Sequence, residues 1–181
     1  CKNLLSKSLI KLGDTSLELD NKLLTFIGEI AYSENLRNDA KIVELLHDRG
    51  ASFSDLSGQY LQDFTDILNV KFGYVGLVAA YRKYPDQQDF EGLCSFIVNF
   101  CYRFIKVQKG GVGVLAQAMC DVAKVIRESN GIEDARREVS TILLDKSGDD
   151  TFKEHYKNIV FKSAKLGYYN LFWLERYKLN G

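Results

Sequence analysis

The chain has 181 residues, of which 46% are hydrophobic, and its 24 basic and 24 acidic residues give a formal net charge of zero. This composition is typical of a soluble globular chain, and the zero net charge excludes an overall field that would attract nucleic acid or anionic lipid. No apolar run reaches the ~20 residues of a membrane-spanning helix, so we expect no membrane partner.

The first half of the sequence predicts helices. A single proline, Pro85, leaves few interruptions, and signals for β-hairpins are scarce. Apolar residues at helical spacing predict a helix over residues 4–12, a second over residues 23–30, and a third from a cap at Asn38 to a stop at Gly50. A stronger stripe predicts a fourth helix over residues 56–68. A fifth is expected over residues 74–84, where Pro85 ends it.

The most apolar run, FIVNFCYRFIKV at residues 96–107, carries Arg103 in its middle. The few polar side chains of this segment fall at Ser95, Asn99, Arg103 and Lys106, spaced four, four and three residues apart. That spacing forms one stripe on a helix, whereas a strand would mix charged and apolar side chains on one face. The sequence therefore predicts a helix that is buried over most of its circumference.

The rest of the chain predicts a loop at QKGGVG, which lacks the GxxxxGK[ST] pattern of phosphate-binding loops, and helices over residues 114–129 and 132–144. SGDDTFKE is expected to start another helix, with Thr151 and Glu154 as a capping box, and KLGYYNLFWLERY ends the chain as the last helix. The predicted fold is all-α, a single bundle of seven to nine helices over residues 1–181. Because the chain starts at Cys1 without methionine, we expect it to be a fragment of a larger multidomain protein.

The four cysteines do not form a metal site by their spacing. Cys1, Cys94, Cys101 and Cys120 lack CxxC spacing and cluster with no histidine, so we expect reduced core thiols, in keeping with a cytoplasmic location.

No residues in the sequence combine a nucleophile with a base. His47 near a helix C-terminus and His155 near a helix start are expected to cap helices or face solvent. Asp149 and Asp150 are interpreted as helix-start residues rather than metal ligands, and the run YRKY at residues 81–84 as an ordinary helix end rather than a nucleic-acid surface. We therefore expect no catalytic residue, metal or cofactor.

Four patterns in the second half follow one another in the order and with the spacing found in one family: FIVNFCYRFIKV, AQAMCDVAKVI, VSTILLDKSGDDTFKEHY and LGYYNLFWLE. Over residues 60–180 the chain resembles the helical region of bacterial antiphage proteins of the GmrSD kind, the modification-dependent type IV restriction proteins. In that family an N-terminal ParB-like domain carries a DGQQR-type nucleotide-binding motif, and a C-terminal His-Me finger domain carries the nuclease. Neither motif is present in this sequence, so no enzymatic residue carries over.

The resemblance implies a non-catalytic helical scaffold or sensing domain. Nucleotide hydrolysis and DNA cleavage would then reside in other parts of the parent protein, whose sister domains would be the partners. The alternative is a free-standing α-helical protein–protein interaction module with no DNA role.

The C-terminal end is mildly basic, because residues 151–181 carry six Lys or Arg against two acids. One hypothesis is that these side chains contact DNA phosphates, with strongly salt-dependent binding. The alternative is a solvated basic face. The candidate residues are Lys157, Lys162, Lys165, Arg176 and Lys178.

Arg103 raises a further question, because its stripe is the only polar line on an otherwise apolar helix. If Ala164, Tyr168, Leu171 and Phe172 form the buried face of the last helix, Glu175 falls on that face and needs a partner. We predict an Arg103–Glu175 salt bridge of structural importance. The alternatives are an arginine that reaches solvent or backbone carbonyls, and a pair with another acid.

Overall fold

The computed structural model describes residues 16–48, 53–161 and 163–180, and in these residues it contains only helices, turns and loops. The eight α-helices of the described residues are α2 (Ser16–Asp48), α3 (Asp55–Asp63), α4 (Gly73–Lys83), α5 (Gln87–Cys101), α6 (Val112–Glu128), α7 (Ile132–Lys146), α8 (Asp149–Lys157) and α9 (Ala164–Asn180). Two π-helical segments, η2 (Phe64–Leu68) and η3 (Tyr102–Val107), continue α3 and α5. The predicted all-α fold and helix number are confirmed.

Backbone contacts divide the chain into two units, residues 1–41 and residues 42–181, and the boundary lies inside α2. In the first unit, the described part of α2 exposes large apolar side chains such as Ile27, Ile30, Tyr32 and Leu36. The second unit holds the packed helices. The expectation of one domain over residues 1–181 stays a prediction.

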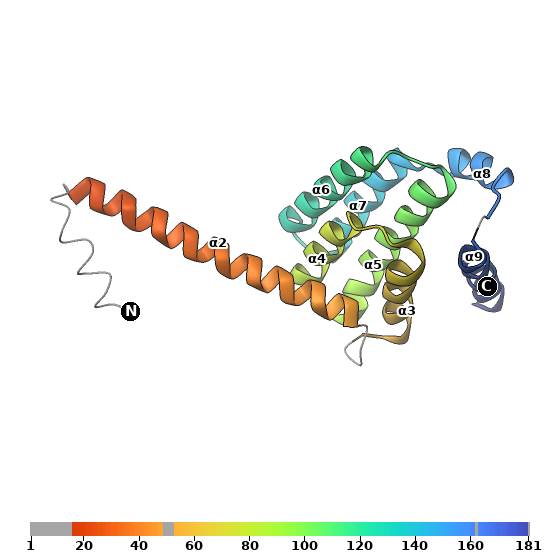
Figure 1. Cartoon of the computed structure of the whole chain (residues 1–181), viewed down its shortest axis with the longest axis horizontal. Helices are drawn as coiled ribbons and strands as arrows, with labels where there is room; N and C mark the ends of the chain where they lie inside the picture. Colours follow the sequence, from red (N-terminus) through yellow and green to blue (C-terminus); the bar gives the residue numbers. More distant parts are fainter. Residues whose placement is uncertain (1–15, 49–52, 162, 181) are drawn as a thin grey trace. The chain divides into compact units, whose positions relative to one another are not determined.

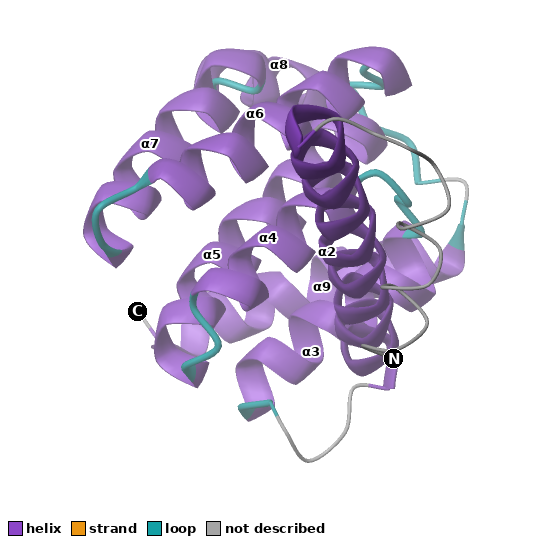
Figure 2. Ribbon diagram, turned by 90° about the vertical axis from the view of Figure 1, so that its left-hand side faces the viewer, coloured by secondary structure: helices purple, strands orange, loops and turns teal. Residues whose placement is uncertain are grey.

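Helices α4, α5, α6 and α7 lie side by side in the second unit (Figures 1 and 2). α4 packs against α5 and α6, while α7 packs against α5 and α6 from another side, and α3 packs on α5. α8 contacts η3, and α9 contacts η2. The fully buried side chains at the centre include Phe64, Phe90, Leu93, Ile97 and Met119. Segment α5–η3 is therefore the element that contacts α3, α4, α7 and α8.

The predicted polar stripe on this segment is confirmed. Asn99 is exposed, and Ser95, Arg103 and Lys106 are half-buried, while most of the remaining circumference is buried. Phe96 is an exception, since this ring is exposed. The helical hydrogen-bond pattern changes from α to π at Tyr102. Such π segments are rare and often mark functional or strained positions.

Several predicted helix boundaries hold. α4 ends at Lys83, two residues before Pro85, and Asp86 caps α5 by accepting a 3.0 Å hydrogen bond from the Gln88 amide. QKGGVG contributes a loop, since η3 ends at Val107 and α6 begins at Val112. The expected helix over residues 4–12 and the stop at Gly50 lie outside the described residues.

Two local predictions are wrong. The separate second and third helices are one continuous α2, and Asn38 lies inside it, because the segment between them contains neither proline nor glycine to break the helix. The capping box is also absent. α8 begins at Asp149 with Gly148 as its N-cap and no side-chain cap, which places Thr151 inside the first turn.

Candidate interaction surface on the last helix

Helix α9 turns one narrow face toward the rest of the second unit. Tyr169 and Asn170 are buried on this face, and Leu166 and Trp173 are half-buried. The four positions follow the helical spacing of one stripe. We call them the inner face of α9.

A buried carboxylate holds the inner face to α3. Asp63, at the end of α3, is 5% exposed, and its Oδ2 accepts a hydrogen bond of 2.9 Å from the Trp173 indole Nε1–H. Its Oδ1 accepts another, also of 2.9 Å, from Gln59 Nε2. The Trp173 ring stacks on Tyr60 with centroids 4.6 Å apart. Burial raises the pKa of Asp63, and the two hydrogen bonds oppose that shift only in part.

A second buried group holds the inner face to η3 and α8. Asn170 Oδ1 accepts hydrogen bonds from the Tyr102 hydroxyl and, at 3.3 Å, from the Tyr156 hydroxyl. Asn170 Nδ2 donates to the Leu166 carbonyl at 2.6 Å. Burial raises the pKa of Tyr102 above its usual range, and burial likewise raises the pKa of Tyr169. Tyr102 is therefore a hydroxyl donor throughout the ordinary pH range.

The opposite side of α9 is apolar and exposed. Tyr168 is 73% exposed and Leu171 62%, and Phe172 and Leu174 are exposed as well. We call these four residues the outer face. Isolated exposed apolar side chains are ordinary on protein surfaces, but a contiguous group of large ones on one helix typically marks an interaction site. The described charged neighbours are Lys165 and Glu175, one toward each end of this face.

The predicted Arg103–Glu175 salt bridge is wrong. The Arg103 Nη2 group donates instead to the Ser147 carbonyl and to Asp149 Oδ1, both at 2.7 Å, and the guanidinium lies 4.5 Å from the centre of the Phe152 ring. Glu175 is exposed, because α9 buries the face opposite to the one expected. Two of the alternatives are both observed, because Arg103 contacts a backbone carbonyl and also pairs with another acid.

The arginine contacts link η3 to the start of α8. Asp149 is 65% exposed, while the Arg103 side chain is only 22% exposed and the Ser147 residue is buried. The hydrogen bond from Arg103 lowers the pKa of Asp149. Asp149 is thus a helix-start residue, as expected, but its partner is a side chain from another element rather than its own helix.

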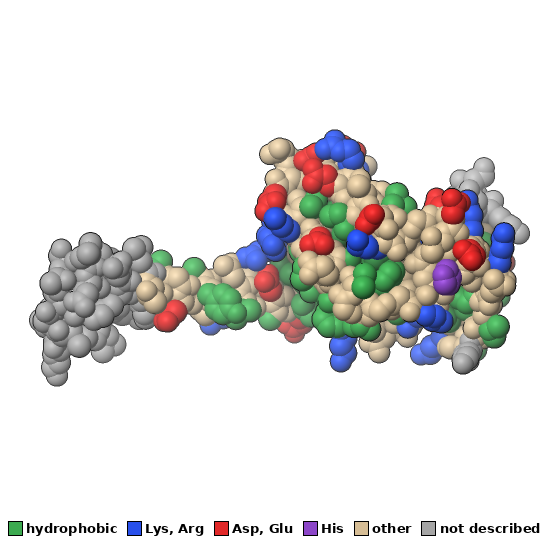
Figure 3. Space-filling model, turned by 90° about the horizontal axis from the view of Figure 1, so that it is seen from above, with side chains coloured by type: hydrophobic (Ala, Val, Ile, Leu, Met, Phe, Trp, Pro, Cys, Tyr) green, Lys and Arg blue, Asp and Glu red, His purple; other side chains and the backbone are tan. Residues whose placement is uncertain are grey.

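The residues proposed to contact DNA are only partly described. Lys157 lies in the last turn of α8 and Lys165 near the start of α9, and both are exposed. Lys162 lies outside the described residues, as do the side chains of Arg176 and Lys178. Over the described surface of the second unit, acidic and basic side chains are interspersed on the face seen in Figure 3. The DNA hypothesis stays a prediction.

The expected histidine positions are half correct. His47 lies in the last turn of α2, as expected, and stacks on Tyr74 with ring centroids 4.9 Å apart. His155 is exposed, but it lies in the last turn of α8 rather than near its start.

The cysteines differ from one another. Cys94 and Cys101 are buried free thiols, as expected, and burial raises the pKa of Cys101 to about 12. Cys120 is exposed, so its assignment to the core is wrong, and Cys1 lies outside the described residues. Within the part of the chain that the structure describes, no group of three or more His, Cys, Asp or Glu side chains could hold a metal ion.

Sequence reasoning missed the buried polar groups that fix α9. One signal was present: Asp63 is an acid inside the apolar stripe of residues 56–68, directly before Phe64. Trp173 is the single tryptophan of the chain. The two residues lie 110 positions apart in the sequence, so no local pattern predicts their hydrogen bond.

Comparison of the chain with models of protein families, with curated proteins and with solved structures finds no match. No helix among the described residues is long and apolar enough to cross a membrane.

Proposed function

We propose that this chain is a non-catalytic helical scaffold or sensing domain of a bacterial, cytoplasmic protein related to type IV restriction systems. In this proposal the outer face of α9 packs against a sister domain of the same parent protein. Nucleotide hydrolysis and DNA cleavage would reside in that parent, outside this chain. The observation that carries the proposal is that α9 has an inner face fixed by buried polar contacts and an exposed, apolar outer face.

The inner face of α9 supports this proposal because its polar contacts fix the orientation of the helix. Asp63 binds Trp173, and Tyr102 binds Asn170, so the helix has a defined register against the bundle. A helix held in this way presents Tyr168, Leu171 and their neighbours in a constant geometry. Preorganised apolar surfaces of this kind lose little entropy when a partner binds.

The charges next to the outer face define the partner further. Lys165 lies near the first turn of α9 and Glu175 three turns later, and both are exposed. A complementary sister domain would present an apolar surface with an acidic group facing Lys165 and a basic group facing Glu175. The resemblance to GmrSD-type proteins favours a sister domain as the occupant.

Leu171→Glu tests this assignment. Its matched control is Leu144→Glu, because Leu144 is an exposed leucine (48%) on α7, away from α9. Both variants would be introduced into the complete natural protein and scored for plating efficiency of phage. Co-purification of this chain with the separately expressed flanking domains would be measured in parallel. We expect Leu171→Glu to lose both signals and Leu144→Glu to keep them, with unchanged melting temperatures for both.

Two results would contradict the proposal. Full restriction and full co-purification by Leu171→Glu would show that the outer face is not a docking surface. A natural reading frame with neither a DGQQR-type segment upstream nor a nuclease segment downstream would exclude the restriction context. The chain would then be the alternative, a free-standing interaction module with no DNA role.

DNA contact by the basic C-terminal residues is a separate proposal, supported by the exposure of Lys157 and Lys165. Titration of the chain with duplex DNA at low salt tests it. Neutralisation of several phosphates would make the affinity fall about tenfold or more between low and physiological salt. No binding at low salt would leave these lysines as a solvated face.

A further inference from the structure

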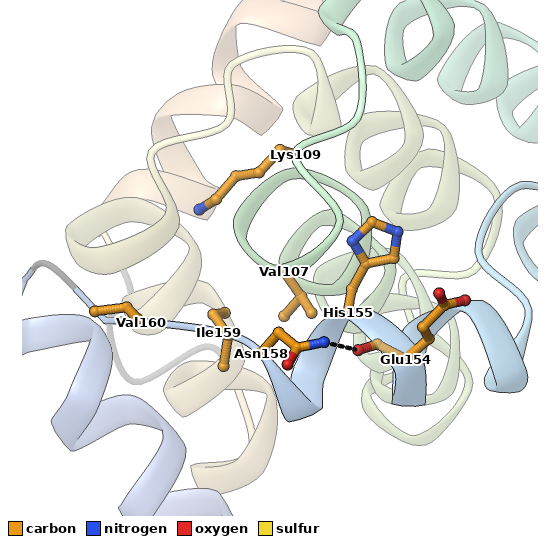
Figure 4. A pocket seen from close by; sticks show the side chains of 7 residues that line it. All are labelled: Val107, Lys109, Glu154, His155, Asn158, Ile159 and Val160. Atoms are coloured by element: carbon orange, nitrogen blue, oxygen red, sulfur yellow. Dashed lines mark hydrogen bonds between the residues drawn. The ribbon is translucent and has the colours of Figure 1, made fainter.

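A hollow of about 350 Å³ lies between the loop that follows η3 and the C-terminal end of α8 (Figure 4). Two segments that are far apart in the sequence form it. The end of η3 and the loop after it contribute Val107 and Lys109, and α8 with the residues that follow it contributes Glu154, His155, Asn158, Ile159 and Val160. Its volume lies at the lower end of the range of about 300–1,000 Å³ for small-molecule sites. A ligand of this hollow would therefore be small.

One part of the lining is apolar. Val107 is buried and Ile159 is half-buried against the core, whereas Val160 is 77% exposed. An exposed valine next to two better-covered aliphatic side chains leaves apolar surface that a ligand can remove from water. This wall suits the hydrocarbon part of a ligand.

The polar part of the lining holds one ammonium group, that of Lys109, one carboxylate, that of Glu154, and the side chains of His155 and Asn158. Lys109 and His155 lie on different sides of the hollow, and Glu154, the one acid of the lining, lies beyond His155 from Lys109 (Figure 4). Lys106 does not line the hollow, and burial and the charge of Lys109 lower its pKa, which disfavours its ammonium form. Among the described residues, neither lysine forms an ion pair with a carboxylate.

The loop that carries Lys109 has a defined conformation. Lys109 has a φ of 57°, in the left-handed region that non-glycine residues seldom adopt. The amides of Gln108 and Gly110 donate to the carbonyls of Arg103 and Phe104 at 2.9 and 2.8 Å, and the Lys109 ammonium donates to the Lys106 carbonyl at 2.6 Å. These hydrogen bonds close the C-terminal end of η3, and a left-handed residue commonly ends a helix in this way, as Asn69 does after η2.

The loop also contains an unpaired buried group. Gln108 Nε2 is buried and has no hydrogen-bond partner among the described residues, but Gln108 is not one of the residues that line the hollow.

We propose that this hollow binds a small organic anion. Lys109 and His155 would contact its carboxylate or phosphate group, and its apolar body would lie against Val107, Ile159 and Val160. Charge-assisted hydrogen bonds to the anion would replace the self-contact of Lys109 with the Lys106 carbonyl. The site is independent of the outer face of α9 and of any role of that face.

NMR titration of the 181-residue chain tests the proposal. The probes are phenyl phosphate and benzoate, which distinguish the two anionic groups, with phenol and inorganic phosphate as partial ligands. We expect saturable shifts of the amides of residues 107–110 and 158–160 with one or both of the organic anions. Phenol and inorganic phosphate should bind at least about tenfold more weakly, because phenol lacks the anionic group and inorganic phosphate lacks the apolar body.

Lys109→Asn is the matching variant, because asparagine tolerates the left-handed backbone and removes the cation. The control is Lys153→Asn on α8, whose lysine pairs loosely with Asp150 at 3.9 Å and does not line the hollow. We expect Lys109→Asn to raise the dissociation constant about tenfold and Lys153→Asn to leave it unchanged. If Lys109→Asn alters the dispersed spectrum of the fold, His155→Gln repeats the comparison from an exposed position of α8. Absence of saturable shifts, equal binding of phenol, or unchanged affinity of the lining variants would overturn the proposal.

Discussion

The hydrogen bond between Trp173 and Asp63 allows a direct measurement of how α9 is held. Trp173→Phe removes the Nε1–H donor that lies 2.9 Å from Asp63 Oδ2, and it retains an aromatic ring that can stack on Tyr60. Asp63 is 5% exposed in the parent protein, and Gln59 would be its remaining hydrogen-bond donor in the variant. The variant therefore removes one hydrogen bond to a buried acid together with part of the packing of the larger indole ring, and the dependence of the loss on pH identifies the hydrogen-bond component.

The expected loss depends on the charge of Asp63. A hydrogen bond to a charged group contributes roughly 1.5–3 kcal/mol, so near neutral pH we expect Trp173→Phe to lower the free energy of unfolding by about 2–3 kcal/mol. Burial raises the pKa of Asp63 above its value in the unfolded chain, and loss of the Trp173 donor raises it further. Between the two pKa values the folded state binds more protons than the unfolded state. The contribution of Asp63 to stability therefore increases as pH falls and is lost as pH rises through the folded pKa. The deficit of Trp173→Phe should shrink in acid.

Urea unfolding followed by far-UV circular dichroism at several pH values gives this measurement, because Trp173 is the single tryptophan and the variant has no indole fluorescence. Asp63→Asn is the control. Its amide oxygen can accept from Trp173, and its NH₂ can donate to a rotated Gln59 amide, so we expect near-parental stability at neutral pH without the acid-dependent component. A loss below about 0.5 kcal/mol for Trp173→Phe, or a loss that does not change with pH, would refute the assigned role of the buried carboxylate.

Three other predictions concern the described helices. Gly73→Ala should lower the free energy of unfolding by about 1–3 kcal/mol in urea melts, because the added Cβ would lie 2.6 Å from a buried phenylalanine ring. Gly58→Ala has open space around the added Cβ and should raise the free energy of unfolding by about 0.5–1 kcal/mol. Equal effects of the two variants would contradict the packing around Gly73. Arg103→Met should lower the stability measured in thermal melts by about 1–3 kcal/mol, because it leaves the buried Ser147 carbonyl without its donor. Asp149→Asn should lower stability clearly less, because that carboxylate is exposed. The reverse order would show that the ion pair contributes more than the hydrogen bond to the carbonyl. A thiol reagent followed by peptide mass mapping should modify Cys120 in the native protein and spare the two buried thiols until urea unfolds the chain, and rapid native labelling of the buried thiols would contradict their burial.

The elements that could be predicted are those with one-sided patterns. The segment from Ser95 to Lys106 carries its polar residues on one stripe, so periodicity alone fixed both its helical state and its exposed side. The end of α4 followed from Pro85, which cannot continue a helix. In both cases the determining information is local in the sequence.

Contacts between distant residues could not be predicted. The acceptors for Arg103 lie 44 and 46 residues away, on the turn before α8 and on its first residue. Periodicity showed that an arginine on this stripe needs a polar neighbour, but the choice among solvent, carbonyl and acid depends on how the α7–α8 turn approaches η3. That approach is a property of packing and leaves no pattern in either segment.

Helix α9 shows the same limit in its sharpest form. The helix carries two stripes at helical spacing, and both contain aromatic side chains. The first stripe consists of residues 164, 168, 171, 172 and 175, and the second of residues 166, 169, 170 and 173. Hydrophobicity favours burial of the first stripe, yet the structure buries the second. A half-turn rotation of the helix would cover Tyr168, Leu171 and Phe172, but it would leave Asp63 without its indole donor and Tyr102 without Asn170. Because an unsatisfied buried polar group costs about 1–3 kcal/mol, and a charged one more, two such losses oppose the gain from covering the outer face. The buried polar groups thus select the orientation of α9, and that selection is what leaves a large apolar surface available to a partner.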